Sequence, residues 1–61
     1  MLGDEELDRL LLELMSTDAA NDWARRPNPS LDGLSPVESI RQDGPNAVRG
    51  ILEAMADGTF T

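Results

Sequence analysis

The sequence predicts an all-α fold, a compact bundle of about four short helices. Apolar residues recur at i, i+3, i+4 and i+7 near both ends of the chain, which is the spacing of one helical face. No stretch alternates apolar and polar residues as a half-buried strand does. Proline, glycine and serine cluster in the middle, at positions that start and stop helices. The expected helices cover about 4–16, 18–26, 36–42 and 45–57.

The first expected helix combines an acidic first turn with a wide apolar stripe. Acidic side chains at a helix start suit the positive end of the helix dipole. The stripe repeats at i, i+3, i+4 and i+7 and consists of Leu7, Leu10, Leu11 and Leu14, with Leu12 and Met15 beside it. This apolar area exceeds what one packed face requires, and exposed apolar patches mark association. We therefore expect a homodimer, and its candidate self-association contacts are Leu7, Leu11, Leu12 and Met15.

The second expected helix carries the only tryptophan of the chain, Trp23. Pro27 limits this helix, because the residue before a proline is pushed out of the α region. Trp23 is either a core anchor or an interface hot spot. Arg25 and Arg26 are adjacent and cannot both be buried, so at least one is expected to contact a partner at the surface.

The third expected helix has a strong start signal. Ser35 at the N-cap and Glu38 at N3 form a capping box, and Pro36 occupies N1, where its missing N–H costs nothing. The preceding segment, 27–33, holds two prolines, an asparagine and a glycine, and is expected to be irregular.

The last expected helix starts at Pro45 by the same N1 argument and ends before Gly58, a C′ glycine stop. Its apolar stripe consists of Val48, Ile51, Leu52 and Met55. Gly50 inside this helix costs about 1 kcal/mol relative to alanine. Either the close approach of a backbone, from this domain or from a partner, offsets that cost, or the cost is simply tolerated.

The composition bounds the function. The 61 residues carry twelve acidic side chains against five basic ones, all arginine, and a net charge of −7. That balance disfavours binding to nucleic acid by this chain alone and favours a basic protein surface. Histidine and cysteine are absent, so we expect no disulfide, metal site, cofactor or catalytic residue, and not an enzyme. No signal peptide or membrane span is recognisable, and a cytoplasmic protein is expected.

Two runs of residues resemble a known family. They are W-x-x-x-P-N-P-x-L-x-G-x-S-P-x-E, from Trp23 to Glu38, and V-x-x-I-L-x-A-M-A-D-G-T-F, from Val48 to Phe60. As a set they resemble the C-terminal toxin-binding domain of Xre/MbcA/ParS antitoxins, and the MbcA-like branch most closely. The resemblance covers about 18–61.

The resemblance implies a small helical bundle that binds a RES-domain toxin, an enzyme that consumes NAD. In such antitoxins the C-terminal segment lies over the toxin's active-site entrance. Carried onto this sequence, the covering segment is Gly58, Thr59, Phe60 and Thr61, with Arg25 and Arg26 as supporting contacts. From the residues alone, Phe60 has two alternatives, because it can fold back onto the core or project from the domain.

One departure from the family concerns DNA. Such antitoxins usually carry an N-terminal helix-turn-helix, and only about 17 residues precede the resemblance. We therefore divide the chain into 1–17, a candidate self-association helix, and 18–61, the toxin-binding part. The sequence leaves open whether this is a natural short protein or an excised domain.

Three functions are open at this stage. The leading one is an antitoxin module that blocks a RES-type toxin. The second is a self-associating scaffold or regulatory protein, phage-encoded or orphan, that binds another protein. The third is a DNA-associated transcriptional regulator, against which the net charge of −7 argues.

Overall fold

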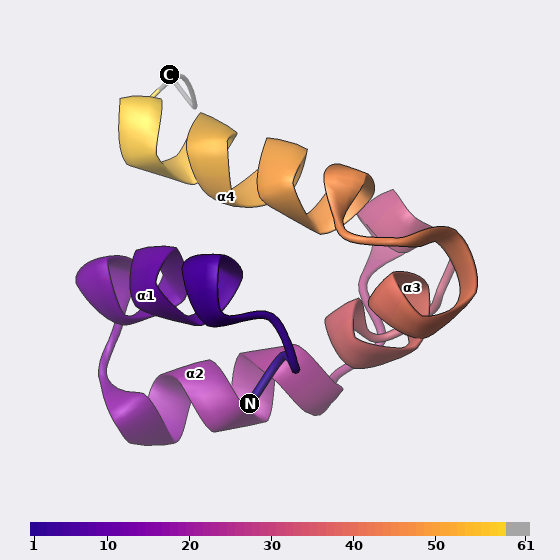
Figure 1. Ribbon diagram of the computed structural model, residues 1–61, viewed down its shortest axis with the longest axis horizontal. Coiled ribbons are helices and arrows are strands. Elements are labelled where there is room, and N and C mark those ends of the chain that lie inside the picture. The colour runs from indigo at the N-terminus through magenta and orange to yellow at the C-terminus, as the bar shows by residue number, and fades with distance from the viewer. Residues whose placement is uncertain (59–61) are drawn as a thin grey trace.

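Four α-helices and one short 3₁₀ turn form the fold in the computed structural model, which describes residues 1–58 (Figure 1). The elements are α1 (Glu5–Leu14), α2 (Thr17–Arg25), the 3₁₀ turn η1 (Pro29–Leu31), α3 (Pro36–Asp43) and α4 (Asn46–Asp57). The predicted all-α class and the four helices are confirmed, and the helix bounds differ from the expected ones by one or two residues. The turn η1 lies inside the segment that was expected to be irregular.

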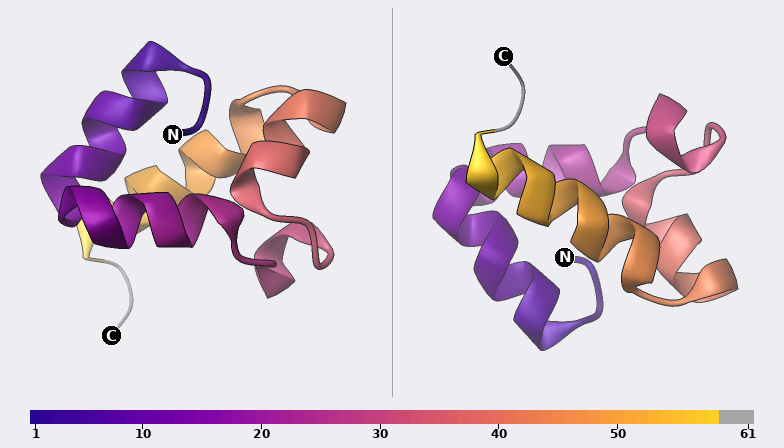
Figure 2. Two further views of the ribbon diagram at one scale, coloured as in Figure 1. Left: turned by 90° about the horizontal axis from the view of Figure 1, so that it is seen from below. Right: turned by 90° about the horizontal axis from the view of Figure 1, so that it is seen from above.

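The helices pack in four pairs: α4 packs against α3 and against α1, and α2 packs against α3 and against α1. In Figure 1, α1 and α4 both run from the side of α3 toward the opposite end of the molecule, and α2 runs back from that end toward α3. Figure 2 shows the same course of α2 from below and from above. The buried hydrophobic residues of the core come from α1, α2, α4, η1 and the start of the chain, and α3 adds the buried Pro36 together with Val37 and Ile40, which pack against this core. The buried cluster consists of Leu2, Leu7, Leu11, Ala20, Ala24, Leu31, Val48 and Leu52.

Side-chain caps define three of the helix starts. Asp4 caps α1 by accepting a hydrogen bond from the Leu7 N–H at 3.1 Å, and Ser16 caps α2. At α3 the predicted capping box is confirmed, because the Ser35 hydroxyl accepts from the Glu38 N–H at 3.2 Å and the Glu38 carboxylate accepts from the Ser35 N–H at 3.1 Å. These short-range pairs are set by local sequence, which is why they were predictable.

The start of α4 differs from its prediction. Pro45 is the N-cap residue rather than N1, and no side chain caps the helix there. Pro45 already has helical backbone angles, φ −82° and ψ −9°. The helix therefore begins one residue later than expected, although the fixed φ of Pro45 already suits helical geometry.

The first helix is part of the core rather than a separate association element. Leu7 and Leu11 are 0% exposed, so they cannot contact a second copy while the domain is folded, and their assignment to a self-association surface is corrected. On the same helix Leu12 is 45% exposed, and Met15 at its C-cap is partly buried. Self-association through these two residues stays a prediction. Because α1 packs against α2 and α4, no packing boundary falls at residue 17.

The first residues of the chain close one side of the core. Leu2 is 3% exposed, and its backbone N–H donates to the Asp8 carboxylate at 2.8 Å. The sequence analysis gave this residue no role, because a single leucine before a helix has no periodicity. Within residues 1–58, no helix has the length and apolar character that crossing a lipid bilayer requires.

Candidate functional site

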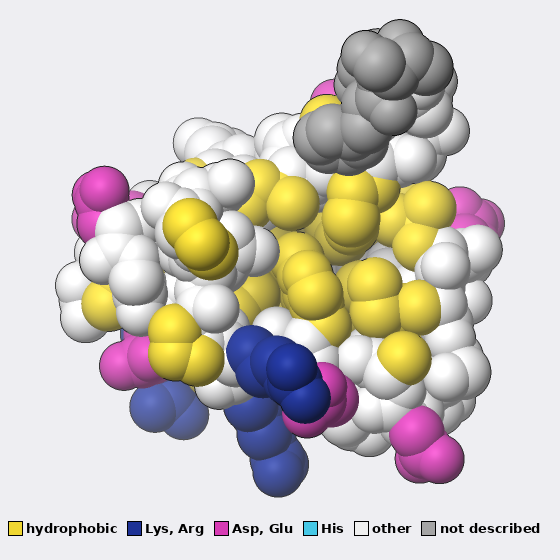
Figure 3. Space-filling model, turned by 180° about the vertical axis from the view of Figure 1, so that it is seen from behind, with side chains coloured by type: hydrophobic (Ala, Val, Ile, Leu, Met, Phe, Trp, Pro, Cys, Tyr) yellow, Lys and Arg dark blue, Asp and Glu magenta, His cyan; other side chains and the backbone are white. Residues whose placement is uncertain are grey.

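A broad area of hydrophobic side chains lies between α2 and α4 (Figure 3). These two helices do not pack closely against each other, although both pack against α1 and α3. Trp23 on α2 and Ile51 and Met55 on α4 are partly buried hydrophobic residues that pack against the core. We call this surface the α2–α4 face.

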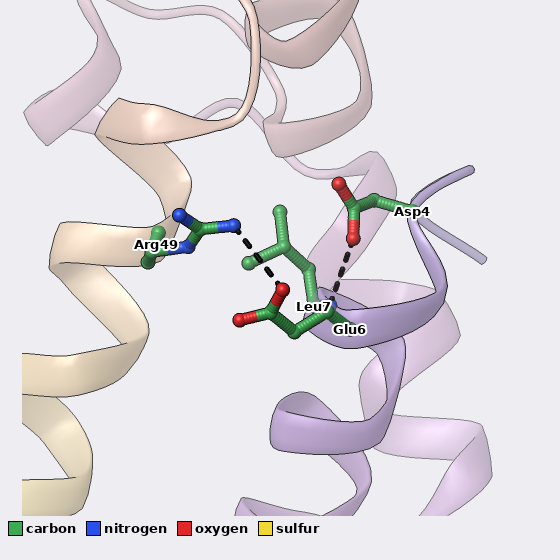
Figure 4. A network of polar contacts seen from close by, with 4 residues as sticks. All are labelled: Asp4, Glu6, Leu7 and Arg49. Carbon is green, nitrogen blue, oxygen red and sulfur yellow. Dashed lines mark hydrogen bonds and ion pairs between the residues drawn. The ribbon is translucent and has the colours of Figure 1, made fainter.

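The two flanks of α4 are different. Arg49 lies on the flank that faces α1, where its Nη2 atom is 3.5 Å from the Glu6 carboxylate (Figure 4). Ile51 follows two residues later, about 200° around the helix axis, and so lies on the opposite flank. Met55 is one turn further along on that same side. One flank of α4 is therefore closed onto α1, and the other carries the α2–α4 face.

The space-filling view from behind supports this description. Figure 3 shows hydrophobic side chains gathered in one broad area between α4, along the top, and α2, along the bottom. Charged side chains stand at the borders of this area rather than inside it. The arrangement resembles the apolar centre and polar rim of a protein–protein interface.

The exposed surfaces of α2 and α4 carry charged side chains of both signs. Asp18 and Asp22 are exposed on α2, and Glu53 and Asp57 are exposed on α4. Among the described residues, only Asp22 of these four is in an ion pair, with the Arg26 Nε atom at 2.6 Å. Because both of these side chains are largely exposed, the pair contributes little to stability.

The residues predicted to bind a partner lie at two edges of this surface. Arg25 and Arg26 are both exposed at the C-terminal end of α2, next to α3. Gly58 is the C-cap of α4, whose end lies on the side of the molecule away from α3. Thr59, Phe60 and Thr61 lie outside the described residues. The structure therefore does not bring the arginine pair and the end of α4 together, and the α2–α4 face lies between them.

The structure bears on the alternatives that the sequence left open for Trp23 and for Gly50. Trp23 is neither fully buried nor free of the core, since it is partly buried and packs against the core edge. An added Cβ at Gly50 would meet no atom within 4 Å. No backbone of this domain approaches Gly50, so the alternatives that remain for it are approach by a partner or simple tolerance.

The sequence analysis missed Arg49. Its Nε atom is buried and has no hydrogen-bond partner within residues 1–58, and its guanidinium reaches the Glu6 side chain across two helices. Only the packing of α1 against α4 brings these residues together. No periodicity or short motif in the sequence could have indicated the pair.

Chemical features are sparse over the same residues. The structure has no detectable pocket, and residues 1–58 contain no group of three or more acidic side chains arranged to hold a metal ion. A hydrogen bond from the Ser35 backbone N–H, together with a side-chain hydrogen bond to Ser35, lowers the pKa of Glu38. That carboxylate belongs to the capping box of α3.

Comparison with known protein families identifies the fold. The family described as the antitoxin Xre/MbcA/ParS C-terminal toxin-binding domain matches residues 2–58. The chain belongs to this family. The match includes α1, which the resemblance seen in the sequence left outside. No curated protein and no solved structure matched the chain. Family membership makes the domain a toxin-binding antitoxin module.

Proposed function

We propose that this antitoxin domain neutralises a RES-domain toxin, which consumes NAD, by covering the toxin's active-site entrance with the segment from Gly58 to Thr61. The observation that carries the proposal is the end of α4. Gly58 adopts a left-handed conformation, φ 65°, that ends α4 directly before Thr59. A partner that contacts this end of α4 would meet the chain where it leaves the helix. Membership of the toxin-binding family supports a toxin as this partner.

The mechanism requires no catalysis by the antitoxin. A segment that occupies the entrance of an NAD-binding site excludes the dinucleotide sterically. The acidic character of the chain, with Asp57 directly before Gly58 and a net charge of −7, adds electrostatic complementarity. Sites that receive a pyrophosphate present cationic and dipolar groups, and these also attract carboxylates.

Deletion of Thr59–Thr61 tests the covering segment. We expect the shortened domain to keep its helical content and to bind a purified RES-domain toxin, and to lose most of its inhibition of NAD consumption. The readouts are circular dichroism, calorimetric binding and an NAD assay. Undiminished inhibition would contradict the proposal, and so would a parallel loss of folding and inhibition.

The arginine pair is tested by substitution. Arg25→Ala with Arg26→Ala should weaken toxin binding and leave the melting temperature nearly unchanged, because both side chains are exposed and the Arg26–Asp22 pair is a surface pair. Arg9→Ala with Arg41→Ala removes two exposed arginines elsewhere and is the matched control. Equal weakening by both double variants would indicate a general charge effect rather than a contact.

A second candidate property, self-association, is favoured by Leu12, which is 45% exposed on α1. We infer that this residue, with Met15, holds two copies together weakly, because few apolar atoms are available there. Sedimentation at tens of micromolar should show a dimer that Leu12→Gln dissociates. A monomer at that concentration rules the dimer out.

A further inference from the structure

We propose that the bond between Asp57 and Gly58, at the end of α4, is a site of spontaneous covalent modification. At this site Asp57 becomes an isoaspartyl residue, in which the main chain passes through the side-chain carbon atoms. The consequence for inhibition rests on the proposed function, whereas the site itself does not. The change requires no enzyme and no reactant other than water.

The reaction joins two groups that are neighbours in the chain. The Gly58 backbone nitrogen attacks the Cγ atom of the Asp57 carboxyl group in its protonated form. The N–H proton and the carboxyl O–H leave together as water, and a five-membered succinimide ring results. Water then reopens the ring. Attack at Cγ restores aspartate, and attack at the main-chain carbonyl carbon of Asp57 gives the isoaspartyl product. Glycine favours the first step, because it has no Cβ to hinder its nitrogen or to restrict its rotation.

Three aspartate–glycine pairs occur in the chain: Asp32–Gly33, Asp43–Gly44 and Asp57–Gly58. All three aspartates are exposed, and all three glycines have positive φ angles. Neither the motif nor exposure nor the glycine conformation therefore separates the three pairs. They differ in the hydrogen bond that holds the glycine N–H, which is the attacking group.

Two of the glycine nitrogens are held inside the fold. The Gly33 N–H donates to the Asn28 carbonyl at 3.1 Å, and the Asn28 N–H donates to the Leu34 carbonyl at 2.9 Å, so this turn is tied on both sides of the glycine. The Gly44 N–H donates to the Ile40 carbonyl at 3.0 Å. Gly44 also lies between α3 and α4, which pack against each other. Either nitrogen can attack only after a supported turn has opened.

The third nitrogen is held least firmly. The Gly58 N–H donates to the Met55 carbonyl at 3.3 Å, which is the longest of the three bonds and exceeds the usual value of about 2.9–3.0 Å. The ends of elements open at a lower free energy than the interior of a fold. The structure therefore ranks Gly58 first among the three attacking groups.

The product changes the direction of the chain after α4 and leaves the charge as it was. An isoaspartyl link adds one main-chain carbon between α4 and Gly58, and the freed carboxyl group keeps the negative charge. Val48 and Leu52, which anchor α4 in the core, lie one and two turns earlier. We therefore expect the fold to persist. On the proposed function, the segment from Gly58 to Thr61 no longer meets the toxin's entrance.

The first experiment measures the modification without a toxin. The full chain is kept at neutral pH and physiological temperature, and isoaspartate is located by peptide mapping and by methylation with a protein isoaspartyl methyltransferase. We expect it to accumulate several-fold faster at Asp57 than at Asp32 or Asp43. In guanidinium chloride, which removes the three hydrogen bonds, the three rates should converge. Faster reaction at Asp32 or Asp43 in the folded protein would overturn the inference, and so would the same ranking in the denatured chain.

The second experiment measures the effect on inhibition of a purified RES-domain toxin, with each protein compared with its own fresh sample. The unsubstituted domain should lose inhibition in proportion to its isoaspartate at Asp57. Asp57→Glu keeps the charge and cannot form the five-membered ring, so its inhibition should not change with age. Asp43→Glu is the matched control and should lose inhibition as the unsubstituted domain does.

The two experiments fail separately. If the fresh domain inhibits no RES-domain toxin but isoaspartate still forms first at Asp57, the proposed function fails and the modification site stands. If isoaspartate accumulates at Asp57 and inhibition persists in full, the inferred effect on the covering segment is wrong.

Discussion

The two flanks of α4 show how one helix serves both folding and binding. On one flank Arg49 reaches Glu6 of α1, and the neighbouring Val48 and Leu52 are fully buried. On the other flank Ile51 and Met55 touch only the edge of the core and keep part of their surface. The four apolar residues form one stripe in the sequence, and the rest of the chain buries Val48 and Leu52 fully but Ile51 and Met55 only in part.

The difference follows from the size of the domain. A chain of about 60 residues buries only about 60% of the surface that it exposes when unfolded, so its core cannot cover every apolar flank. Here α4 packs against α1 and α3, whereas α2 and α4 do not pack closely against each other. An apolar flank that folding leaves open is available to a partner. In this antitoxin domain we therefore expect stability and binding to depend on different residues of the same helix.

The largest expected effect comes from the closed flank. Leu52 is 0% exposed, and Leu52→Ala should lower the free energy of unfolding by about 2–5 kcal/mol, because it removes buried methyl groups and leaves a cavity. Met55→Gln on the open flank should cost clearly less, since its side chain is only partly buried. Urea denaturation followed by circular dichroism measures both. Similar losses for the two variants would mean that the open flank also belongs to the core.

The comparison also shows what the sequence could predict. The helices and the capping box of α3 depend on residues three or four apart, and periodicity and short motifs report them directly. Which side of α4 becomes buried depends on contacts between segments that are distant in the chain, such as the contact of Glu6 with Arg49. For the same reason Leu7 and Leu11 could not be separated from Leu12, although all three lie in one leucine-rich run.

The candidate site was predictable only in part. Arg25, Arg26 and Gly58 are at the surface as expected, because charge and a C′ glycine are local signals. The surface between them was not predicted, since it results from the separation of α2 from α4. No pattern in the sequence encodes a space between two helices.

Two glycines of α4 give the next largest effect, in opposite directions. Gly50 has helical geometry with open space around it, so Gly50→Ala should raise stability by about 1 kcal/mol. Gly58 has φ 65°, and Gly58→Ala should lower stability by about 1–2 kcal/mol, because a Cβ disfavours the left-handed conformation. Thermal unfolding measures both. A Gly50→Ala domain that is more stable but binds its toxin less tightly would favour close approach of a partner at that position.

The ion pair between Arg49 and Glu6 should contribute less to the stability of the domain than the two glycine positions do. The Arg49 side chain is 36% exposed and the Glu6 side chain is 74% exposed, so Glu6→Gln should cost at most about 1 kcal/mol. Arg49→Met should be neutral or slightly stabilising, because it keeps the apolar stem and removes the buried Nε atom that lacks a partner. A large loss in either variant would show that charge, rather than apolar packing, closes this flank of α4. The measurement is the urea midpoint at low and high salt.

The smallest expected effect is a change in pH dependence at α3, which packs against α4. The backbone hydrogen bond from Ser35, followed by the side-chain hydrogen bond to Ser35, lowers the pKa of Glu38 below its ordinary value of 4.5, and Arg41 adds to this. Since the pKa of Glu38 is lower in the folded state, its ionised form adds stability above the unfolded pKa. That stability is lost as the pH falls from 4.5 through the lower folded pKa. Glutamine at N3 still closes the capping box, so Glu38→Gln should fold normally at pH 7 and show a shallower loss of stability on acidification. If the difference in stability between the two proteins stays constant from pH 6 to about pH 3, the Glu38 carboxylate has no linked role in holding the α3–α4 side of the core.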